Sequence, residues 1–206
     1  MKNLLLISIL FINAIIMQSQ VVTETRIETS DDILVIQIDG LPNICIRNGN
    51  IYKVEVEAEK KNQSHIKTSV KDKKISIISR KFFESSHYIV YITIPNKSIH
   101  IKANDVANIY IDKNTTLQID TISLSANAVA NIYLDKIITN TLNCKLNSVA
   151  NITIKGSANK CNLNFKSVAN TKLNEFKIKD TNLLLKDVAN FELNTTENND
   201  DFDIKK

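Results

Sequence analysis

The 206-residue sequence has no Trp, only 3 Gly and 2 Pro, and its aromatic residues make up 6% of the chain. With so few glycines, the chain contains neither a glycine-rich phosphate loop nor a Gly-x-Ser-x-Gly nucleophile elbow. Apolar residues make up 43%, which is enough to bury a core and excludes a disordered chain. Asn, Ile, Lys and Thr are abundant and favour strands and tight turns over helices. The length suits one large domain or two small ones.

The N-terminal residues have the pattern of an export signal. Lys2 precedes an almost unbroken apolar run from Leu4 to Met17, and Gln18-Ser19-Gln20 follows it. The competing interpretation is a membrane anchor, but a spanning helix needs about 20 apolar residues and this run is shorter. No Cys lies at the end of the run, where cleavage would occur, which argues against a lipid anchor. We predict that residues 1–19 are a signal peptide cleaved after Ser19, and that the protein is exported to the periplasm, the cell surface or the medium.

Charge and cysteine content limit the partners. The formal net charge is +4, and residues 1–19 carry one Lys and no acid, so the mature charge is 4 − 1 = +3. This charge is too small and too dispersed to indicate nucleic-acid binding. The mature chain keeps Cys45, Cys144 and Cys161, and an odd number leaves at least one thiol unpaired.

Short apolar-rich runs lie between residues 33 and 96, at 33–38, 44–46, 52–59, 74–78 and 87–94. In the run 52–59 the apolar Val54, Val56 and Ala58 alternate with Glu, as in a strand with one buried face. The segments 47–50 and 71–74 have the composition of hairpin turns. We therefore predict an antiparallel β region over residues 20–97, ended by Pro95.

A repeat follows this region. The tripeptide Val-Ala-Asn recurs at 106–108, 129–131, 149–151, 168–170 and 188–190, with alternating apolar residues on both sides of each copy. Each copy therefore predicts two strands joined at a corner, and a period near 20 fits one coil of a stacked solenoid. We predict an all-β fold with a right-handed parallel β-helix of five ~20-residue coils over residues 98–194. With the antiparallel region it forms one β domain over 20–194, and residues 195–206 are a polar C-terminal tail.

The corner residues have predicted structural roles. Val fills the bend from inside, Ala is small where the backbone turns, and Asn tolerates left-handed backbone angles. Stacked corners also predict a ladder of side-chain amides made by Asn108, Asn131, Asn151, Asn170 and Asn190. Cys144 and Cys161 point inward on neighbouring coils but are two residues out of register, which predicts buried free thiols and no disulfide.

The outer residues before each corner form a polar, mildly basic surface with no acidic residue. Asn143, Lys145 and Asn147 lie on this surface, and Tyr110 and Tyr133 are predicted to stack just beyond the corner. Amides beside an aromatic pair could hold a sugar, so these five residues are the candidate ligand-binding residues. The alternative for the two tyrosines is an ordinary cross-strand pair that stabilises the sheet.

No residue is predicted to be catalytic or to bind a metal or cofactor. His65, His87 and His100 have no Cys or carboxylate at metal-ligand spacing, which indicates surface histidines. Asp112 and Asp135 are predicted to stack on adjacent coils, and glycosidase carboxyls lie about 5 to 9.5 Å apart. Each of the two is followed by Lys at a strand end, which favours a solvated turn residue. A second aspartate column, Asp105 and Asp187, is split by intervening coils.

Taken together, these features resemble the auto-transporter adhesin family called the head GIN domain, which occurs in exported proteins of Gram-negative bacteria. The resemblance begins with DDILVIQIDGLPNICIRNGNIYKVEVEAEKK, continues through KKISIISR and YIVYITIPNKSIHIKANDVANIYI, and then covers the repeats. Family members have a Ser-Gly-Ala-Ser-like corner, and in this chain Val replaces the glycine throughout. The resemblance implies surface adhesion and supplies no catalytic residues.

The function expected from the sequence is therefore that of an exported, non-enzymatic adhesin-like protein, with a glycan or an extracellular protein as its partner. The runner-up is a periplasmic structural or stress-related scaffold without a specific ligand. The third alternative is a polysaccharide-active enzyme. Nucleic acid is not an expected partner, no transmembrane helix is expected after signal removal, and the oligomeric state is left open.

Overall fold

The computed structural model describes residues 20–40, 43–79, 88–173, 175–192 and 202–205, and only the backbone of the last stretch. Almost all of these residues are in strands, so the all-β prediction is confirmed. The predicted signal peptide, His87 and most of the predicted C-terminal tail lie outside the described residues. No helix in the described part of the chain is long and apolar enough to cross a membrane.

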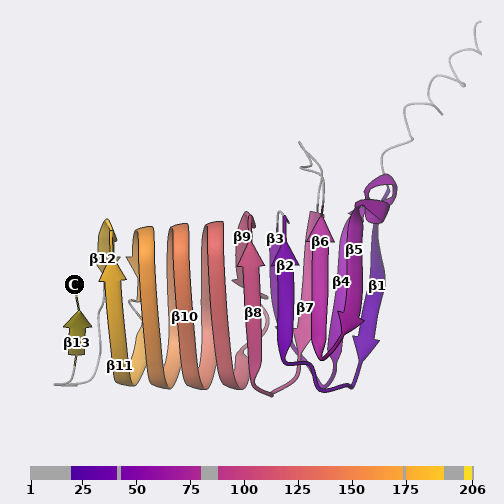
Figure 1. The fold of residues 1–206 in the computed structure, drawn as a ribbon. Coiled ribbons are helices and arrows are strands. Elements are labelled where there is room, and N and C mark those ends of the chain that lie inside the picture. Colours follow the sequence, from indigo (N-terminus) through magenta and orange to yellow (C-terminus); the bar gives the residue numbers. More distant parts are fainter. Residues whose placement is uncertain (1–19, 41–42, 80–87, 174, 193–201, 206) are drawn as a thin grey trace, which may run out of the picture.

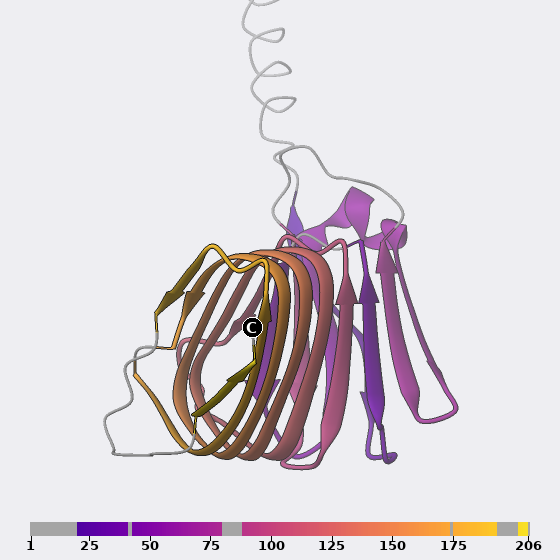
Figure 2. The same cartoon turned by 60° about the vertical axis from the view of Figure 1, so that its left-hand side comes forward.

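The strands form a single 13-stranded sheet, which curls round one core and nearly closes on itself (Figures 1 and 2). Its hydrogen-bonded order is β1 (Val21–Thr29), β4 (Tyr52–Glu59), β7 (Tyr88–Ile94), β3 (Asn43–Asn48), β9 (Asn108–Ile111), β10 (Leu117–Lys172), β8 (Ile99–Asn104), β2 (Val35–Asp39), β6 (Lys74–Ser79) and β5 (Ile66–Lys71). The remaining elements are β11 (Phe176–Lys186), β12 (Asn190–Glu192), β13 (Phe202–Lys205) and the 3₁₀ helix η1 (Lys60–His65).

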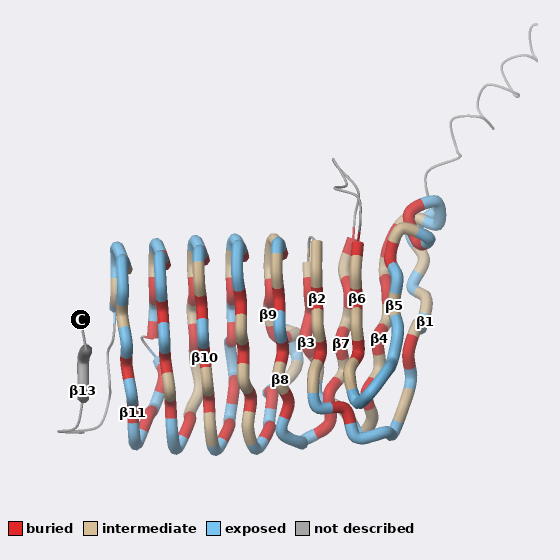
Figure 3. Tube along the Cα trace, viewed as in Figure 1, coloured by how far each residue is buried: buried red, intermediate tan, exposed pale blue. Residues whose placement is uncertain are grey.

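Strand pairing between the repeats is parallel. β10 is one extended element that winds repeatedly round the molecule, and it pairs in parallel with β8, β9, β11 and β12 (Figure 1). The register is that of the sequence repeat, with Ile122 opposite Ile99 and Tyr133 opposite Tyr110. Buried and exposed residues alternate along each winding (Figure 3). The hand of the winding and the number of five coils stay predictions.

The predicted antiparallel region, residues 20–97, is only partly correct. The pairs β1–β4, β4–β7 and β5–β6 are antiparallel, but β2 pairs in parallel with β6 and β8, and β3 pairs in parallel with β7 and β9. The physical reason is that β2 and β3 continue the stack of repeats, with Asp39 opposite Asn104 and Asn43 opposite Asn108. The predicted hairpin at 47–50 is wrong because β7 lies between β3 and β4.

The corner geometry corrects the predicted role of Asn. None of the five repeat asparagines has a positive φ; the left-handed residue is instead the one that precedes Val. That residue is exposed and directs its side chain outward, so several residue types are accepted there. The Val itself is buried in the first four copies, as predicted. The φ angles are 51° at Asp105, 52° at Ala128, 54° at Ser148, 53° at Ser167 and 54° at Asp187.

One hydrophobic core runs through the sheet from β1 to β11. It extends in sequence from Ile27 to Leu183, so the N-terminal strands and the repeats share it. Cys144 and Cys161 are both buried and free, as predicted. Burial raises the pKa of the Cys144 thiol to about 12 and also raises that of Cys161, so both pack as small apolar residues.

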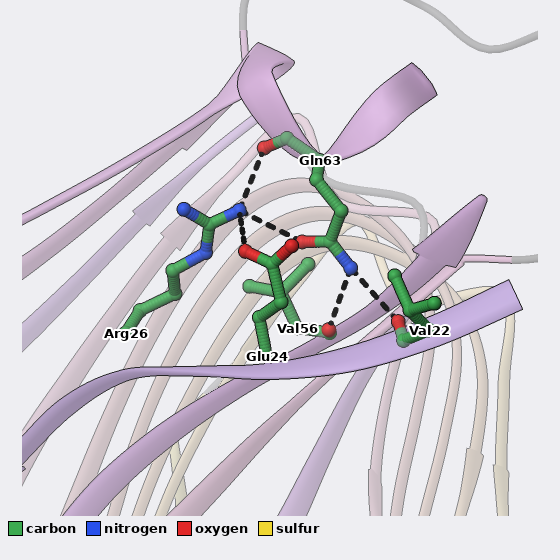
Figure 4. A network of polar contacts seen from close by, with 5 residues as sticks. All are labelled: Val22, Glu24, Arg26, Val56 and Gln63. Atoms are coloured by element: carbon green, nitrogen blue, oxygen red, sulfur yellow. Dashed lines mark hydrogen bonds and ion pairs between the residues drawn. The ribbon is translucent and has the colours of Figure 1, made fainter. Parts of the chain in front are cut away.

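A polar network closes the end of the molecule near the N-terminus (Figure 4). The Gln63 side chain, 4% exposed, donates from Nε2 to the carbonyl oxygens of Val22 (2.8 Å) and Val56 (3.0 Å). Arg26 donates from Nη2 to Oε1 of Gln63 (2.8 Å) and pairs with Glu24 (2.8 Å). One glutamine thus ties η1 to both β1 and β4. At the other end of the molecule, β13 extends the sheet by pairing in parallel with β11.

Candidate functional site

The polar wall before the corners is built by alternate residues of β8, β10 and β11. We call this surface the amide face. Its columns run across the strands because equivalent residues of successive windings stand side by side. The intervening residues, such as Ile101 and Leu124, point into the core. The amide face consists of His100, Lys102, Asn104, Ser123, Ser125, Asn127, Asn143, Lys145, Asn147, Asn162, Asn164, Lys166, Asn182, Leu184 and Lys186.

Side-chain hydrogen bonds fix the orientation of the amides on this face. Asn182 donates to Oδ1 of Asn162 (2.8 Å), Asn162 donates to Oδ1 of Asn143 (2.7 Å), and Asn143 donates to Oγ of Ser123 (3.1 Å). Each bonded amide keeps a second N–H hydrogen and a second oxygen lone pair that the column does not use. The result is a row of oriented donors and acceptors that faces solvent.

The amide face is hollowed where its side chains are short. A groove of about 490 Å³ lies over Ser123 and Ser125, with the amide column along it. The groove crosses several windings, because it is lined by His100 on β8 as well as by Leu184 on β11. Leu184 is 42% exposed and gives the groove an apolar contact beside its polar groups.

A second hollow of about 390 Å³ adjoins the first one. It is lined by Lys102, Asn104, Asn127 and Asn147, among others, and Ser125 and Lys145 line both hollows. The two hollows therefore form one strip, with Ser125 and Lys145 at their junction. No acidic residue lines either hollow among the residues that the structure describes.

The histidine at the β8 end of the strip is a neutral polar group at neutral pH. Its Nε2 lies 2.8 Å from Oγ of Ser125, on the neighbouring winding. Burial and the neighbouring charge of Lys102 lower the pKa of His100 below its usual value of 6.5. The permanent charges of the amide face are consequently those of its lysines.

Comparison with known proteins identifies the fold and the family. The family model described as "Putative auto-transporter adhesin, head GIN domain" matches residues 32–200. The chain belongs to this family. The resemblance deduced from the sequence is therefore confirmed, and it covers most of the described head GIN domain.

Two solved structures are similar to this head GIN domain. A putative adhesin from Parabacteroides merdae superposes with a TM-score of 0.53 at 13% identity, covering 81% of this chain and 78% of its own. A putative adhesin from Parabacteroides distasonis gives 0.53 at 17% identity, covering 80% and 77%. At such identities the likeness establishes a shared fold. No curated protein matches the chain.

The head GIN domain does not bring the five predicted ligand-binding residues together. Asn143, Lys145 and Asn147 lie side by side on the amide face. Tyr110 and Tyr133 are neighbours in register, with Tyr133 39% exposed, but they lie beyond the corner on the β3–β9 wall. The two groups are therefore separate surfaces.

The predicted asparagine column lies at the corner between these surfaces. Asn190 donates to Asn170, Asn170 to Asn151, and Asn151 to Asn131, each at 2.7 Å. The column continues through Asn131 and Asn108 to Asn43, which lies outside the Val-Ala-Asn repeats. Sequence reasoning missed Asn43, although the spacing of Asp39 and Asn43 matches that of Asn104 and Asn108.

A charged clasp on the tyrosine wall was also missed. Arg47 lies over the ring of Tyr91, 3.6 Å from its centroid, and Nε of Arg47 is 2.8 Å from a carboxylate oxygen of Asp112. Tyr91 in turn donates to Glu57 (2.9 Å), and burial together with this carboxylate raises the pKa of Tyr91 to about 12. These residues come from β3, β4 and β7 and from the position directly after β9, so only the long-range strand order brings them together. Their groups bind one another and hold four strands in register.

The aspartates considered as catalytic candidates lack the environment of a catalytic acid. The backbone N–H of Asn114 and the Arg47 guanidinium lower the pKa of Asp112, whereas a glycosidase acid needs a raised pKa. Asp105 and Asp187 occupy left-handed corner positions and are exposed. Within the described residues, no group of three His, Cys, Asp or Glu side chains could hold a metal ion.

Proposed function

We propose that this protein is an exported, non-enzymatic adhesin-like protein that binds an extracellular glycan or matrix protein on its amide face. The observation that carries the proposal is the strip formed by the two adjoining hollows, with Ser125 and Lys145 at their junction and an oriented amide column beside it. Ligand sites combine a concave shape with a few well-placed polar groups, and fixed groups lose less entropy on binding. Membership of a family described as putative adhesins agrees with this function.

The proposal includes the architecture and route expected from the sequence. A right-handed parallel β-helix of five coils would present the amide face as a long, regular surface, and the parallel register of the repeats supports it. A signal peptide at residues 1–19 would deliver the protein to the periplasm, the cell surface or the medium. A hydrolytic role is disfavoured because Arg47 and the backbone N–H of Asn114 bind the Asp112 carboxylate and lower its pKa, which argues against Asp112 as a general acid.

A glycan and matrix-protein array probed with residues 20–206 tests the proposed function. We expect binding that is lost in Lys145→Ala and retained in Tyr133→Ala, because Lys145 lines both hollows and Tyr133 lies on the other wall. The opposite pattern would move the site to the tyrosine wall. Digestion of intact cells with protease gives the location: an exposed protein is cut and a periplasmic one is protected. A protected protein that binds nothing on the array would identify a scaffold without a ligand.

A further inference from the structure

The lysines of the amide face differ from others on the same molecule. Lys53, Lys61 and Lys155 each have a carboxylate within 2.9 Å, from Glu55, Glu59 and Glu175 respectively. Four lysines of the amide face make no ion pair with any residue that the structure describes: Lys102, Lys145, Lys166 and Lys186. Their positive charges therefore remain available to a ligand.

These charges stand in two columns beside the amides. Lys102 and Lys145 share one column with Ser125 between them, so they are two windings, or about 10 Å, apart. Lys166 and Lys186 are direct neighbours in the next column, about 5 Å apart. The positive charge thus recurs along the stacking direction and does not concentrate at one point, which suits an extended polymer with regularly spaced anions.

The amide column adds groups that recognise hydroxyls. Asn162 donates one hydrogen to Asn143 and accepts one from Asn182, which leaves a hydrogen and a lone pair with fixed directions. Sugar hydroxyls are both donors and acceptors and can use both. The exposed Leu184 offers an apolar contact at the β11 end of the groove.

We propose that the ligand of the amide face is an acidic polysaccharide, whose carboxylate or sulfate groups meet the lysines while its hydroxyls bind the amide column. This inference rests on the proposed function and names its ligand class. Nucleic acid is the other common polyanion, but single strands bind on aromatic side chains and the amide face has no Phe, Tyr or Trp. Sugars need no such stacking partner when oriented amides are present.

Binding of residues 20–206 to immobilised polygalacturonate, neutral dextran and DNA tests the inference. We expect binding to polygalacturonate alone, weakened when NaCl is raised from about 50 mM to about 500 mM, because salt screens exposed charges. Lys145→Glu should weaken it about tenfold or more. Lys177→Glu is the matched control because it changes the net charge equally, is exposed, and lies outside the amide face. It should bind like the parent protein, and circular dichroism should show both variants folded.

The other outcomes separate the two proposals. Equal binding to neutral glycans, insensitive to salt but lost in Lys145→Ala, would overturn the acidic ligand and leave the adhesin-like function standing. Binding to DNA as tight as to polygalacturonate would also overturn the acidic polysaccharide. An equal loss in Lys145→Glu and Lys177→Glu would show attraction by net charge without a site. Failure to bind any glycan or matrix protein would overturn both proposals.

Discussion

From Ile99 onward the same side-chain contact returns in every winding and continues into β2 and β3, whereas the other strands before Ser98 are joined by contacts that each occur once. In the repeat region, columns of asparagines bond along the stack at 2.6–2.8 Å. In the N-terminal region, the Gln63 network and the Arg47 clasp each join several strands that differ in direction. Both regions nevertheless bury one shared core.

This difference shows which contacts determine the strand pairing in each region. A parallel stack of similar windings can slip by one residue unless something marks the register, and each asparagine column does so repeatedly. The N-terminal strands have mixed directions and no repeat, so a few buried polar groups must determine how they pair. Substitutions should therefore have distributed effects in the repeats and concentrated effects near the N-terminal end, except where two backbones of the stack approach closely.

The largest expected effect is at such a close approach. Gly156 has φ +123°, and a Cβ added there would lie 1.9 Å from the carbonyl oxygen of Ile137 on the preceding winding. Because that atom belongs to the backbone, it cannot rotate away. We expect Gly156→Ala to reduce the free energy of unfolding by more than about 3 kcal/mol, measured by urea denaturation.

A glycine of the N-terminal region is the matched control. At Gly49 the added Cβ would meet Cγ2 of Thr93, a side-chain atom, at 2.3 Å, and the φ angle is not positive. Gly49→Ala should therefore be less damaging than Gly156→Ala, and Thr93→Ser should restore most of the loss by removing the methyl group. An equal loss at both glycines, without rescue, would mean that the backbone contact at Ile137 is not the cause.

The next largest effect is expected at Gln63. Gln63→Leu keeps the size of the side chain but removes its donors to Val22 and Val56 and its acceptor for Arg26. Losing several buried hydrogen bonds and leaving carbonyls unpaired should cost about 2–4 kcal/mol in urea denaturation. Ser64→Ala, at an exposed position of the same 3₁₀ helix, should change stability little. Similar values for the two variants would show that the network does not hold the N-terminal strands.

A smaller and graded effect is expected along the corner column. Asn151 donates to Asn131 and accepts from Asn170. Asn190, the last member of the column, donates to Asn170 and accepts no side-chain hydrogen bond from the residues that the structure describes. At roughly 0.5–1.5 kcal/mol for each bond, Asn151→Ala should cost about 1–3 kcal/mol and Asn190→Ala about half of that. Urea denaturation of both variants measures the ratio. Negligible and equal shifts would mean that the amides serve only as solvated surface groups.

The repeat region could be predicted because its information is local and periodic. The spacing of Val-Ala-Asn and the alternation around Ile101 or Leu163 specify which residues face the core and which repeats stand in register. Asn143, Lys145 and Asn147 were placed on one face for the same reason. The parity of a strand decides the face of each side chain once one inward residue is known.

The missed features depend on pairings between distant segments. Strand β7 lies between β3 and β4, an order that no local turn signal at 47–50 reveals, and the Arg47–Tyr91 contact exists only because of it. The place of Tyr110 and Tyr133 relative to Lys145 depended on how sharply the corner bends. The prediction of a left-handed Asn was wrong because the left-handed position is the one before Val. Asp, Ala or Ser occupies that position, so residue type gives no signal for it.

The smallest expected effect is a gain in stability at one of these corners. Ala128 has φ 52°, a region that costs an L-residue with a Cβ roughly 1–2 kcal/mol and that glycine adopts freely. Glycine also costs more backbone entropy on folding, about 0.5–1 kcal/mol, so Ala128→Gly should stabilise the protein by a net of about 0.5–1 kcal/mol.

The control is Ala130→Gly, because Ala130 is exposed at the same corner and has no positive φ. It should lose stability by the entropy cost alone. Thermal and urea denaturation that move the two variants in opposite directions would establish that the residue before Val carries the strain of the turn. Gly40, which also has a positive φ, follows Asp39 as Asp105 follows Asn104, so it is the equivalent corner residue in the N-terminal region. Destabilisation of both variants would mean that the residue before Val does not carry the strain of the turn.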